Sequence, residues 1–511
     1  MKKFFKKLWR IITNRVLLIA LSLLVQIALL VLVVVFLSFN SVAVYTAFSV
    51  LSVITCVFVI SKDDNPAYKL AWVVPILALP FFGGFLYIVL GRRNMSPKRK
   101  KRMKHLLREA GEQLDKLSEN ASIPDPDSEK LAELIENSSS FPVFAGTQTQ
   151  YLPCGEVYFE TLICELEKAE KFIFMEFFII RTGEFWDSVL KILERKAAEG
   201  VEVRIMYDDV GCLFKLPSKY DKRLRRAGMH VSVFNRLVPS LDTRMNNRTH
   251  RKIVVIDGKT AFTGGINISD EYINLRQPFG HWKDTGMVLR GRAVNSFTVM
   301  FLSFWAAANK AEKIDFAPYL AKTDEWADAK GFAQPLSGGP GRNEQLIERA
   351  FIRMINTANK YVYINTPYLI IDNEMYTALC IAAKSGVDVR ITAPHVPDKK
   401  AVFMMTRSFY PGLLKSGVKI YEYVPGFIHA KSMVSDDRAA YVGSCNMDYR
   451  SFYLHYECGT FVYDTESIDE IKKDYLNTLK ECKPITYEEA TDVTVFTKIA
   501  RSFLRVFSPL L

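Results

Sequence analysis

The N-terminal part of the chain is dominated by long apolar runs. No charged side chain occurs over 16–61, and at the α-helical rise this stretch covers about 69 Å, about twice the hydrocarbon core of a bilayer. A polar break at 38–41 divides it, which predicts membrane-spanning helices at 16–37 and 42–60. A third uncharged run, 70–90, has prolines and paired glycines near its centre, and we expect it to be a re-entrant segment.

Positive charge flanks this N-terminal membrane region, 1–95, on both sides. Six Lys or Arg residues lie in 1–15 and nine in 91–108, without one acidic residue in either segment. Because positively charged flanks stay on the cytoplasmic side, both ends of the region are predicted to be inside. Two spans satisfy this, whereas the alternative of three spans would place the stronger basic cluster outside. The rest of the chain is therefore expected to face the cytoplasm of a multi-pass membrane protein.

Charge elsewhere argues against a nucleic-acid-binding protein. The whole chain carries a formal charge of +12, and the two basic segments carry 15 positive charges, so the remainder sums to −3. A folded nucleic-acid binder would carry positive charge on its domain surface. The eight cysteines form no C-x-x-C pair and no zinc-like spacing, which is typical of reduced, structural thiols.

Beyond a basic and polar helical linker expected at 96–140, strands alternate with helices, and the pattern occurs twice. Lys171 and the strand after it match Lys360 and its strand, and Gly200 with its strand matches Gly386, at offsets of 189 and 186 residues. This predicts two duplicated, mostly parallel α/β sandwich halves at 141–336 and 337–485, packed as a pseudo-two-fold pair. The glycine-rich segment 337–341 is expected to join them.

The C-terminal segment, 486–511, is predicted to be an amphipathic helix. One helical face carries apolar residues (Phe496, Ile499, Ala500, Phe503, Leu504 and Phe507), and the other carries Lys498, Arg501 and Arg505. Such a helix either lies on a membrane surface or packs on the folded domain.

Each half contains one copy of H-x-K-x4-D, followed seven residues after the Asp by G-[GS]-x-N. The first copy consists of His250, Lys252, Asp257, Gly264, Gly265 and Asn267, and the second of His429, Lys431, Asp436, Gly443, Ser444 and Asn446. Two copies at equal offsets are not expected by chance.

The residue types in this motif suit phosphodiester chemistry. His250 and Lys252 alternate along a predicted strand and so project from the same face, before a turn at Asp257 and a returning strand. An ammonium and an amide suit the oxygens of a phosphodiester. Two imidazoles suit a two-step displacement, in which one attacks phosphorus and the other transfers protons. Since the lysines supply positive charge, we expect no metal and no cofactor.

The duplicated motif resembles the phospholipase D superfamily, and the sequence around it is similar to bacterial cardiolipin synthases. The similar segments are 65–72, 247–257, 264–272, 366–368 and 443–452. The resemblance implies condensation of two phosphatidylglycerol molecules into cardiolipin, with release of glycerol, at a bacterial plasma membrane.

The resemblance also implies a role for each motif residue. His250 would form a phosphatidyl-histidine, and His429 would be the acid and base. Lys252, Lys431, Asn267 and Asn446 would bind phosphate together with the loop residues Gly264, Gly265, Gly443 and Ser444. Asp257 and Asp436 would support the motifs and are grouped with the two histidines and the two lysines as catalytic residues.

The chain departs from the family pattern at one place. His455-Tyr456-Glu457 has His where the resemblance leads us to expect Asn. Glu457 would orient one of the two motif histidines, and Asp284 could be its counterpart in the first half. Asp208, which ends a predicted strand, is a further candidate for a supporting role.

Three alternative functions remain open at this point. They are a phospholipase D-type hydrolase, a phosphatidyltransferase that uses another alcohol, and a catalytically silent membrane scaffold. The intact motifs argue against the scaffold. The sequence does not fix the oligomeric state.

Overall fold

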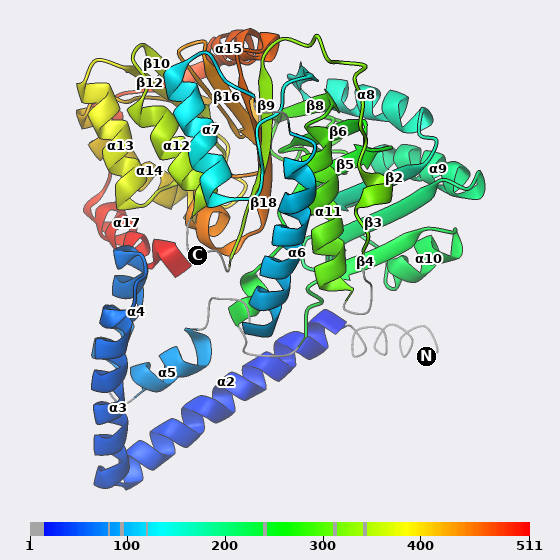
Figure 1. Ribbon diagram of the computed structural model, residues 1–511. Coiled ribbons are helices and arrows are strands. Elements are labelled where there is room, and N and C mark those ends of the chain that lie inside the picture. Colours follow the sequence, from blue (N-terminus) through cyan, green and yellow to red (C-terminus); the bar gives the residue numbers. More distant parts are fainter. Residues whose placement is uncertain are drawn as a thin grey trace. The chain divides into compact units, whose positions relative to one another are not determined.

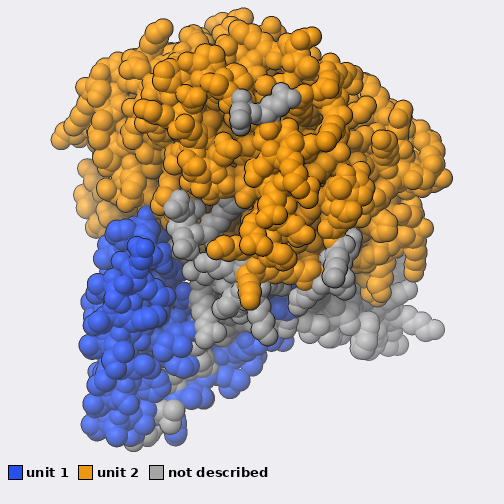
Figure 2. Space-filling view, in the orientation of Figure 1, with its two compact units in different colours: residues 1–94, 236–247, 506–511 blue, residues 95–235, 248–505 orange. Residues whose placement is uncertain are grey.

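The computed structural model describes residues 15–79, 82–91, 97–118, 121–238, 243–309, 314–340 and 345–510 (Figure 1). Two compact units make up the chain (Figure 2). One contains residues 1–94, 236–247 and 506–511, and the other contains residues 95–235 and 248–505. Both copies of the motif therefore belong to the larger unit.

The smaller unit contains the apolar helices. They are α2 (Arg15–Asn40), α3 (Val42–Ser61), α4 (Pro66–Ala78) and α5 (Gly83–Leu90). Among the described residues, α3 is the helix long and apolar enough to cross a membrane, whereas the apolar stretch within α2, Ala20–Val33, is shorter. The break between α2 and α3 lies at Ser41, whose hydroxyl accepts a hydrogen bond from the backbone N–H of Val44 at 3.3 Å and so caps α3.

The third apolar run is bent. Helix α4 ends at Ala78 and α5 begins at Gly83, and Pro80 lies outside the described residues. A Cβ atom on Gly83 would lie 2.5 Å from Cα of Ile76 in α4, and one on Gly84 would lie 2.5 Å from Cα of Ser52 in α3. Only glycine permits this approach. At eight residues, α5 is about 12 Å long and too short to cross a bilayer. The re-entrant path stays a prediction.

The larger unit contains two large sheets. The first is formed by β1 (Thr147–Leu152), β2 (Phe172–Phe177), β3 (Glu202–Asp208), β4 (His230–Phe234), β5 (Lys252–Ile256), β6 (Thr260–Gly264) and β8 (Gly286–Gly291). The second is formed by β9 (Phe332–Gly338), β10 (Tyr361–Asn365), β12 (Asp388–Pro394), β13 (Lys419–Tyr423), β15 (Ser432–Ser435), β16 (Ala439–Gly443), β18 (Glu457–Tyr463) and β19 (Cys482–Ile485).

The strand orders of the two sheets confirm the duplication. The first runs β1-β8-β6-β5-β2-β3-β4, and the second runs β9-β18-β16-β15-β10-β12-β13, with β19 added at its edge. Each sheet is mixed rather than mostly parallel, which corrects the sequence-based expectation. Within the described residues of these two large sheets, the parallel pairs are those among β2, β3 and β4 and among their counterparts β10, β12 and β13. The motif hairpin and the strands after it return without a crossover helix, so they pair antiparallel.

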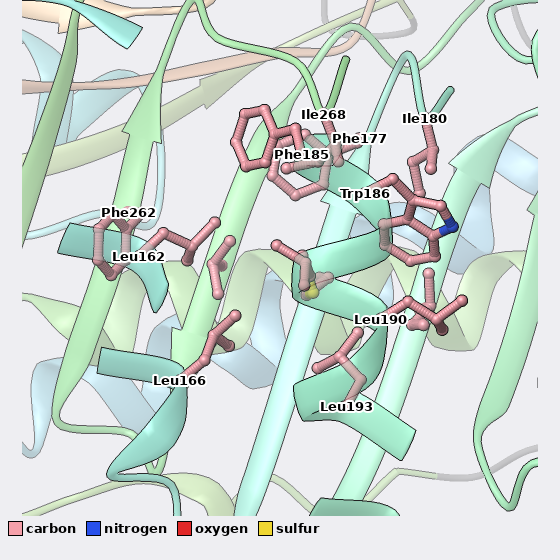
Figure 3. Close-up of a cluster of buried hydrophobic side chains, with 14 of the residues drawn as sticks. Leu162, Leu166, Phe177, Ile180, Phe185, Trp186, Leu190, Leu193, Phe262 and Ile268 are labelled. Carbon is pink, nitrogen blue, oxygen red and sulfur yellow. The ribbon is translucent and has the colours of Figure 1, made fainter. Parts of the chain in front are cut away.

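Helices cover both sheets. They are α6 (Pro97–Asp115), α7 (Pro126–Ser138), α8 (Gly155–Glu167), α9 (Glu184–Ala198), α10 (Tyr220–Arg226), α11 (Val294–Ala308), α12 (Leu346–Asn356), α13 (Asn373–Lys384), α14 (Lys400–Lys415), α15 (Glu466–Leu479), α16 (Tyr487–Thr491) and α17 (Val495–Phe507). Figure 3 shows one core, in which Leu162 and Leu166 of α8 and Trp186 of α9 pack against β2 and β6. Such burial of apolar side chains fixes the strands that carry the motif.

Two expected linkers are folded parts of the larger unit. The guanidinium of Arg102 in α6 donates to the carbonyl of Ala306 in α11 at 2.8 Å, and Gln334 of β9 donates to the carbonyl of Ala132 in α7 at 3.0 Å. Ser337 belongs to β9, which pairs with β18, so the second sheet begins at Phe332, before the expected join.

Candidate active site

The backbone around each motif histidine is held by the other half of the duplication. His250 donates its N–H to the carbonyl of Tyr456 at 2.9 Å, and His429 donates its N–H to the carbonyl of Lys283 at 2.6 Å. A two-stranded parallel sheet, formed by β7 (His281–Lys283) and β14 (Gly426–Ile428), fixes the second contact, and an isolated bridge from Thr249 to Tyr456 fixes the first. The backbone bond to Tyr456 brings His250 beside Glu457, the next residue, and the bond to Lys283 brings His429 beside Asp284.

Those following residues are acids, and each binds the imidazole of the opposite half. Nδ1 of His250 lies 2.9 and 3.0 Å from the two carboxylate oxygens of Glu457. Nδ1 of His429 lies 2.6 Å from Oδ2 of Asp284. Both carboxylates are fully buried, whereas each imidazole side chain keeps 9% of its surface exposed. When Nδ1 donates to a carboxylate, Nε2 of the neutral ring carries a free lone pair.

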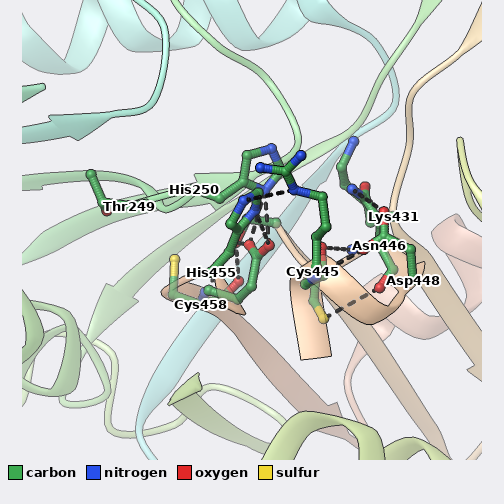
Figure 4. Close-up of polar contacts among 12 residues, drawn as sticks. Thr249, His250, Lys431, Cys445, Asn446, Asp448, His455 and Cys458 are labelled. Atoms are coloured by element: carbon green, nitrogen blue, oxygen red, sulfur yellow. Dashed lines mark hydrogen bonds and ion pairs between the residues drawn. The ribbon is translucent and has the colours of Figure 1, made fainter. Parts of the chain in front are cut away.

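The two halves of the motif meet in one site. Figure 4 shows His250 of the first half and Lys431 of the second in the same close-up. The charges of Lys252, Lys431 and His429 all act to lower the pKa of His250, and those of both lysines lower the pKa of His429. The two histidines and the two lysines therefore lie within electrostatic range of one another, and their joint action on one phosphodiester stays a prediction.

Each lysine is buried beside its own histidine. Nζ of Lys252 donates to the carbonyl of His250 at 2.5 Å, and Nζ of Lys431 donates to the carbonyl of His429. Burial lowers the pKa of Lys252 to about 8 and that of Lys431 to about 7. Withdrawal from water disfavours an ammonium, and an anion bound beside these side chains would restore their charge.

Burial also governs the histidine–acid pairs. It raises the pKa of Glu457 and that of Asp284 to about 7, and it lowers the pKa of His250 and that of His429 well below the usual value. Burial and the neighbouring lysines both lower the pKa of the two rings, so each ring is a neutral base at neutral pH.

Gly265 and Ser444, at matching positions of the two motif loops, each lie against one of the two acids. A Cβ atom on Gly265 would lie 2.1 Å from Oδ1 of Asp284, so only glycine leaves room for this carboxylate. At the matching position, the hydroxyl of Ser444 donates to Oε2 of Glu457 at 2.5 Å. Gly264 has φ +145° and lies against the carbonyl of Thr285. In this geometry Gly265 and Ser444 lie against the two carboxylates, a role that the sequence did not suggest, whereas Gly264 packs against backbone.

The side chains of the two loop asparagines use only part of their hydrogen-bonding capacity within the protein. Oδ1 of Asn267 accepts from the N–H of Ile179 at 3.0 Å, and its Nδ2 donates to the hydroxyl of Tyr272 at 2.7 Å. Asn446 is buried, and its Nδ2 lies 3.4 Å from a carboxylate oxygen of Asp448. An amide nitrogen carries two hydrogens, so each side chain retains a donor for a ligand. Phosphate binding by these asparagines stays a proposal.

The motif aspartates lie away from the histidines, at the far end of the hairpin strands. The carboxylate of Asp257 accepts from the backbone N–H groups of residues 170–172, each at 2.8 Å. The carboxylate of Asp436 accepts from those of residues 359–361 at 2.6–2.9 Å. In both cases the donors lie at the start of the neighbouring strand. Each aspartate has φ +53°, the turn conformation that Asp tolerates. Grouping them with the catalytic residues is therefore not supported, and their support of the motif is structural.

Aromatic side chains surround both imidazoles. The ring centroid of Phe178 lies 5.2 Å from that of His250, and the centroids of Tyr272 and Trp282 lie 5.5 and 5.3 Å from that of His429. These rings exclude water from the site and so strengthen its electrostatic interactions. Sequence reasoning missed them as site residues. Tyr272 follows Asn267 by five residues and Trp282 precedes Asp284 by two, and these two positions were the available signal.

His455 lies next to the first histidine–acid pair. Its ring centroid is 5.5 Å from that of His250, its Nδ1 lies 3.9 Å from Oε1 of Glu457, and its Nε2 accepts from Arg450 at 3.3 Å. Ligand atoms of His250, His455 and Glu457 lie within 4.8 Å of one another, a grouping that could hold a metal ion. Metal binding there would displace the proton that His250 donates, and the ammonium of Lys252 would repel the cation.

Two buried ion pairs flank His250, one made by Arg248 and one by Arg251. Nη2 of Arg251 lies 2.8 Å from Glu176 of β2, which also accepts from the hydroxyl of Thr249. Asp208, at the end of β3, accepts from the N–H of Thr249 at 3.3 Å and lies 3.5 Å from Arg248. Asp208 thus lies where the expected supporting role requires it.

Comparisons with known proteins agree with this geometry. The family described as "Cardiolipin synthase, PLD-like domain" matches residues 162–284 and 351–479, and the family described as "Phospholipase_D-nuclease N-terminal" matches residues 47–92. Proteins named cardiolipin synthase from Geobacillus sp. (strain WCH70) and Geobacillus kaustophilus are each 38% identical to this chain. The matches cover 90% and 91% of it, and 92% and 94% of those proteins.

Two further matches are informative. A Streptococcus mutans protein described as uncharacterized is 46% identical over 75% of this chain and 82% of its own length. A solved structure of phosphatidylserine synthase from Haemophilus influenzae covers 75% of this chain and 98% of its own, with a TM-score of 0.55 and 15% identity. At that identity the structural match shows a shared fold alone.

Replacement of the first motif aspartate should affect stability rather than chemistry. Asp257→Ala removes the acceptor of three backbone N–H groups, and we expect a loss of about 2 kcal/mol in the free energy of unfolding. Thermal unfolding in detergent measures this change. An unchanged unfolding temperature with complete loss of activity would show that Asp257 acts in the site after all.

Proposed function

We infer that this chain, which belongs to the cardiolipin synthases of the phospholipase D superfamily, is a phosphatidyltransferase that condenses two phosphatidylglycerol molecules into cardiolipin and glycerol. The observation that carries the chemistry is the pair of histidine–acid hydrogen bonds that cross between the duplicated halves, beside two buried lysines. Together they support a site in which two bases and two cations would surround one phosphodiester.

The first proposed half-reaction forms a covalent intermediate. Nε2 of His250 attacks the phosphorus of one phosphatidylglycerol, and the bond from phosphorus to the glycerol headgroup breaks. Nε2 of protonated His429 gives its proton to the departing alkoxide, so glycerol leaves as a neutral alcohol. The buried Glu457 carboxylate stabilises the positive charge that develops on His250. The choice of His250 as nucleophile follows the resemblance, because both pairs have the same geometry.

The second half-reaction reverses these roles on a new acceptor. His429 removes a proton from the headgroup hydroxyl of the second phosphatidylglycerol, whose oxygen attacks phosphorus while the P–N bond to His250 breaks. Asp284 holds Nδ1 of His429 and thereby keeps Nε2 directed at the reacting oxygen in both steps. The product is cardiolipin, and His429 is again protonated.

Substrate charge completes the site. In the empty site, burial lowers the pKa of both histidines and both lysines. A phosphodiester brings one negative charge among these groups, which raises their pKa and favours the protonated His429 that the first step requires. Lys252 and Lys431 then neutralise the equatorial oxygens, with the free amide hydrogens of Asn267 and Asn446 as further donors.

Membrane association follows from the family and from the apolar helix α3. We further propose that α2 and α3 both span the plasma membrane, that the bent segment α4–α5 re-enters it, and that the catalytic unit faces the cytoplasm. The basic segments at both ends of this region support that orientation.

Purified full-length protein should convert labelled phosphatidylglycerol in vesicles to cardiolipin and glycerol. His250→Ala and His429→Ala should each abolish the product, and acid quench of the parent protein should leave labelled lipid on the peptide containing His250. Label on the peptide containing His429 would reverse the assignment of the nucleophile. Phosphatidic acid as the sole product would identify a hydrolase instead.

Neutralising the buried acids should slow turnover while the fold persists. Glu457→Gln and Asp284→Asn keep the size of each side chain and an oxygen that accepts from Nδ1, but remove the charge that stabilises the imidazolium. We expect kcat to fall at least about a hundredfold in each variant, with little change in unfolding temperature. Parent-like kcat in either variant would rule out the crossed pairs as catalytic supports.

The lysines predict how binding depends on pH. Because the pKa of Lys431 is about 7 and that of Lys252 about 8 in the empty site, both ammonium groups lose protons as pH rises through this range. Bound phosphate restores their charge, so KM should rise above pH 7 to 8 while kcat changes less. Initial rates measured on vesicles at several pH values separate the change in KM from the change in kcat. A KM that stays constant across this range would contradict buried, ligand-stabilised lysines.

A further inference from the structure

Helix α17 turns its most apolar stripe away from the protein. The exposed fraction is 73% for Val495, 81% for Phe496 and 63% for Ile499. These residues are adjacent or one turn apart, so they form a continuous stripe along the first turns of the helix. Large apolar side chains exposed singly are ordinary in folded proteins, but a contiguous group on one helix indicates an interaction surface.

The opposite side of α17 attaches the helix to the larger unit. Nη1 of Arg501 donates to the carbonyl of Ala490 in α16 at 3.2 Å, and the guanidinium of Arg505 lies 4.3 Å from the ring centroid of Phe409 in α14. Leu504 is half-buried on that side. The sequence left open whether this helix packs on the domain or lies on a membrane. The structure shows that it packs through one side only and leaves the other uncovered at Val495, Phe496 and Ile499.

The charge of the segment around α17 indicates what binds its apolar stripe. The segment 493–511 contains Lys498, Arg501 and Arg505 and no acidic residue. Two copies of this segment would each bring a net positive charge, which disfavours self-association. A bilayer that contains anionic phospholipid offers both apolar chains for the stripe and negative headgroups for the basic side chains. The chain already carries α3, a helix apolar and long enough to cross such a bilayer.

We propose that α17 lies in the interface of an anionic bilayer, with Val495, Phe496 and Ile499 inserted among the acyl chains. The catalytic unit then has a membrane contact of its own, besides the apolar helices of the smaller unit. This contact would hold the unit at the surface from which a lipid substrate must enter. The proposal does not depend on which reaction the site performs.

Site-specific photocrosslinking tests the contact in the full-length protein. A photoreactive benzoylphenylalanine replaces Phe496 or Ile499, or, as a matched control, Ile381, an isoleucine that is 57% exposed on α13 of the same unit. Each protein is reconstituted in vesicles of phosphatidylglycerol and phosphatidylcholine and irradiated. Lipid adducts should be severalfold more abundant at 496 and 499 than at 381.

Three results would overturn the proposal. They are equal lipid labelling at all positions, crosslinked dimers in place of lipid adducts at 496, and an undiminished yield at 496 in vesicles of phosphatidylcholine alone. Cardiolipin formation is measured on the same samples. Because crosslinking needs no turnover, failure of the membrane contact is distinguishable from failure of the proposed reaction.

A second variant tests the stripe without a bulky probe. Phe496→Ser combined with Ile499→Ser alters only exposed side chains, so the unfolding temperature should match the parent. The yield of lipid adducts from a probe at Val495 should then fall severalfold. An unchanged yield would show that the apolar stripe does not hold α17 in the bilayer.

Discussion

The structure of this chain depends on an exchange of acids between its two halves. Glu457 of the second half binds His250 of the first, and Asp284 of the first half binds His429 of the second. Among the described residues, each motif histidine pairs through Nδ1 with an acid of the opposite half. The backbone N–H of each histidine bonds to the residue just before its acid. The alignment of the two backbone segments therefore determines which acid each imidazole meets. The duplication therefore supplies each motif histidine with its acid.

Burial gives this arrangement its chemical character. The two imidazoles, the two lysine side chains and the two carboxylates are all buried, and aromatic rings pack against both imidazoles. Withdrawal from water lowers the pKa of the bases and raises the pKa of the acids, so burial favours the uncharged form of each group. A phosphodiester anion restores the charged forms. Such a site favours its substrate electrostatically without a separate cofactor in the proposed steps.

Much of the site could be predicted from the sequence because its chemistry is local. His250 and Lys252 lie two residues apart on a strand, and the repeated spacing identified the matching pair in the second half. The exchange of acids could not be predicted, because it depends on which faces of two separate sheets meet. The sequence offered Glu457 only as a partner of either histidine. Asp257 was grouped with the catalytic residues because it belongs to the motif, yet its bonds run to the neighbouring strand.

The same reasoning explains the errors at the level of the fold. Alternating strands and helices suggested parallel sheets, but short connections after each motif produce antiparallel neighbours. The most direct test of the shared site is a structure of the full chain with vanadate, a mimic of phosphorus in transfer. We predict vanadate bonded to Nε2 of His250, with Nε2 of His429 at a vanadate oxygen on the opposite side. Vanadate held by one motif alone, with the other Nε2 directed away, would contradict the account.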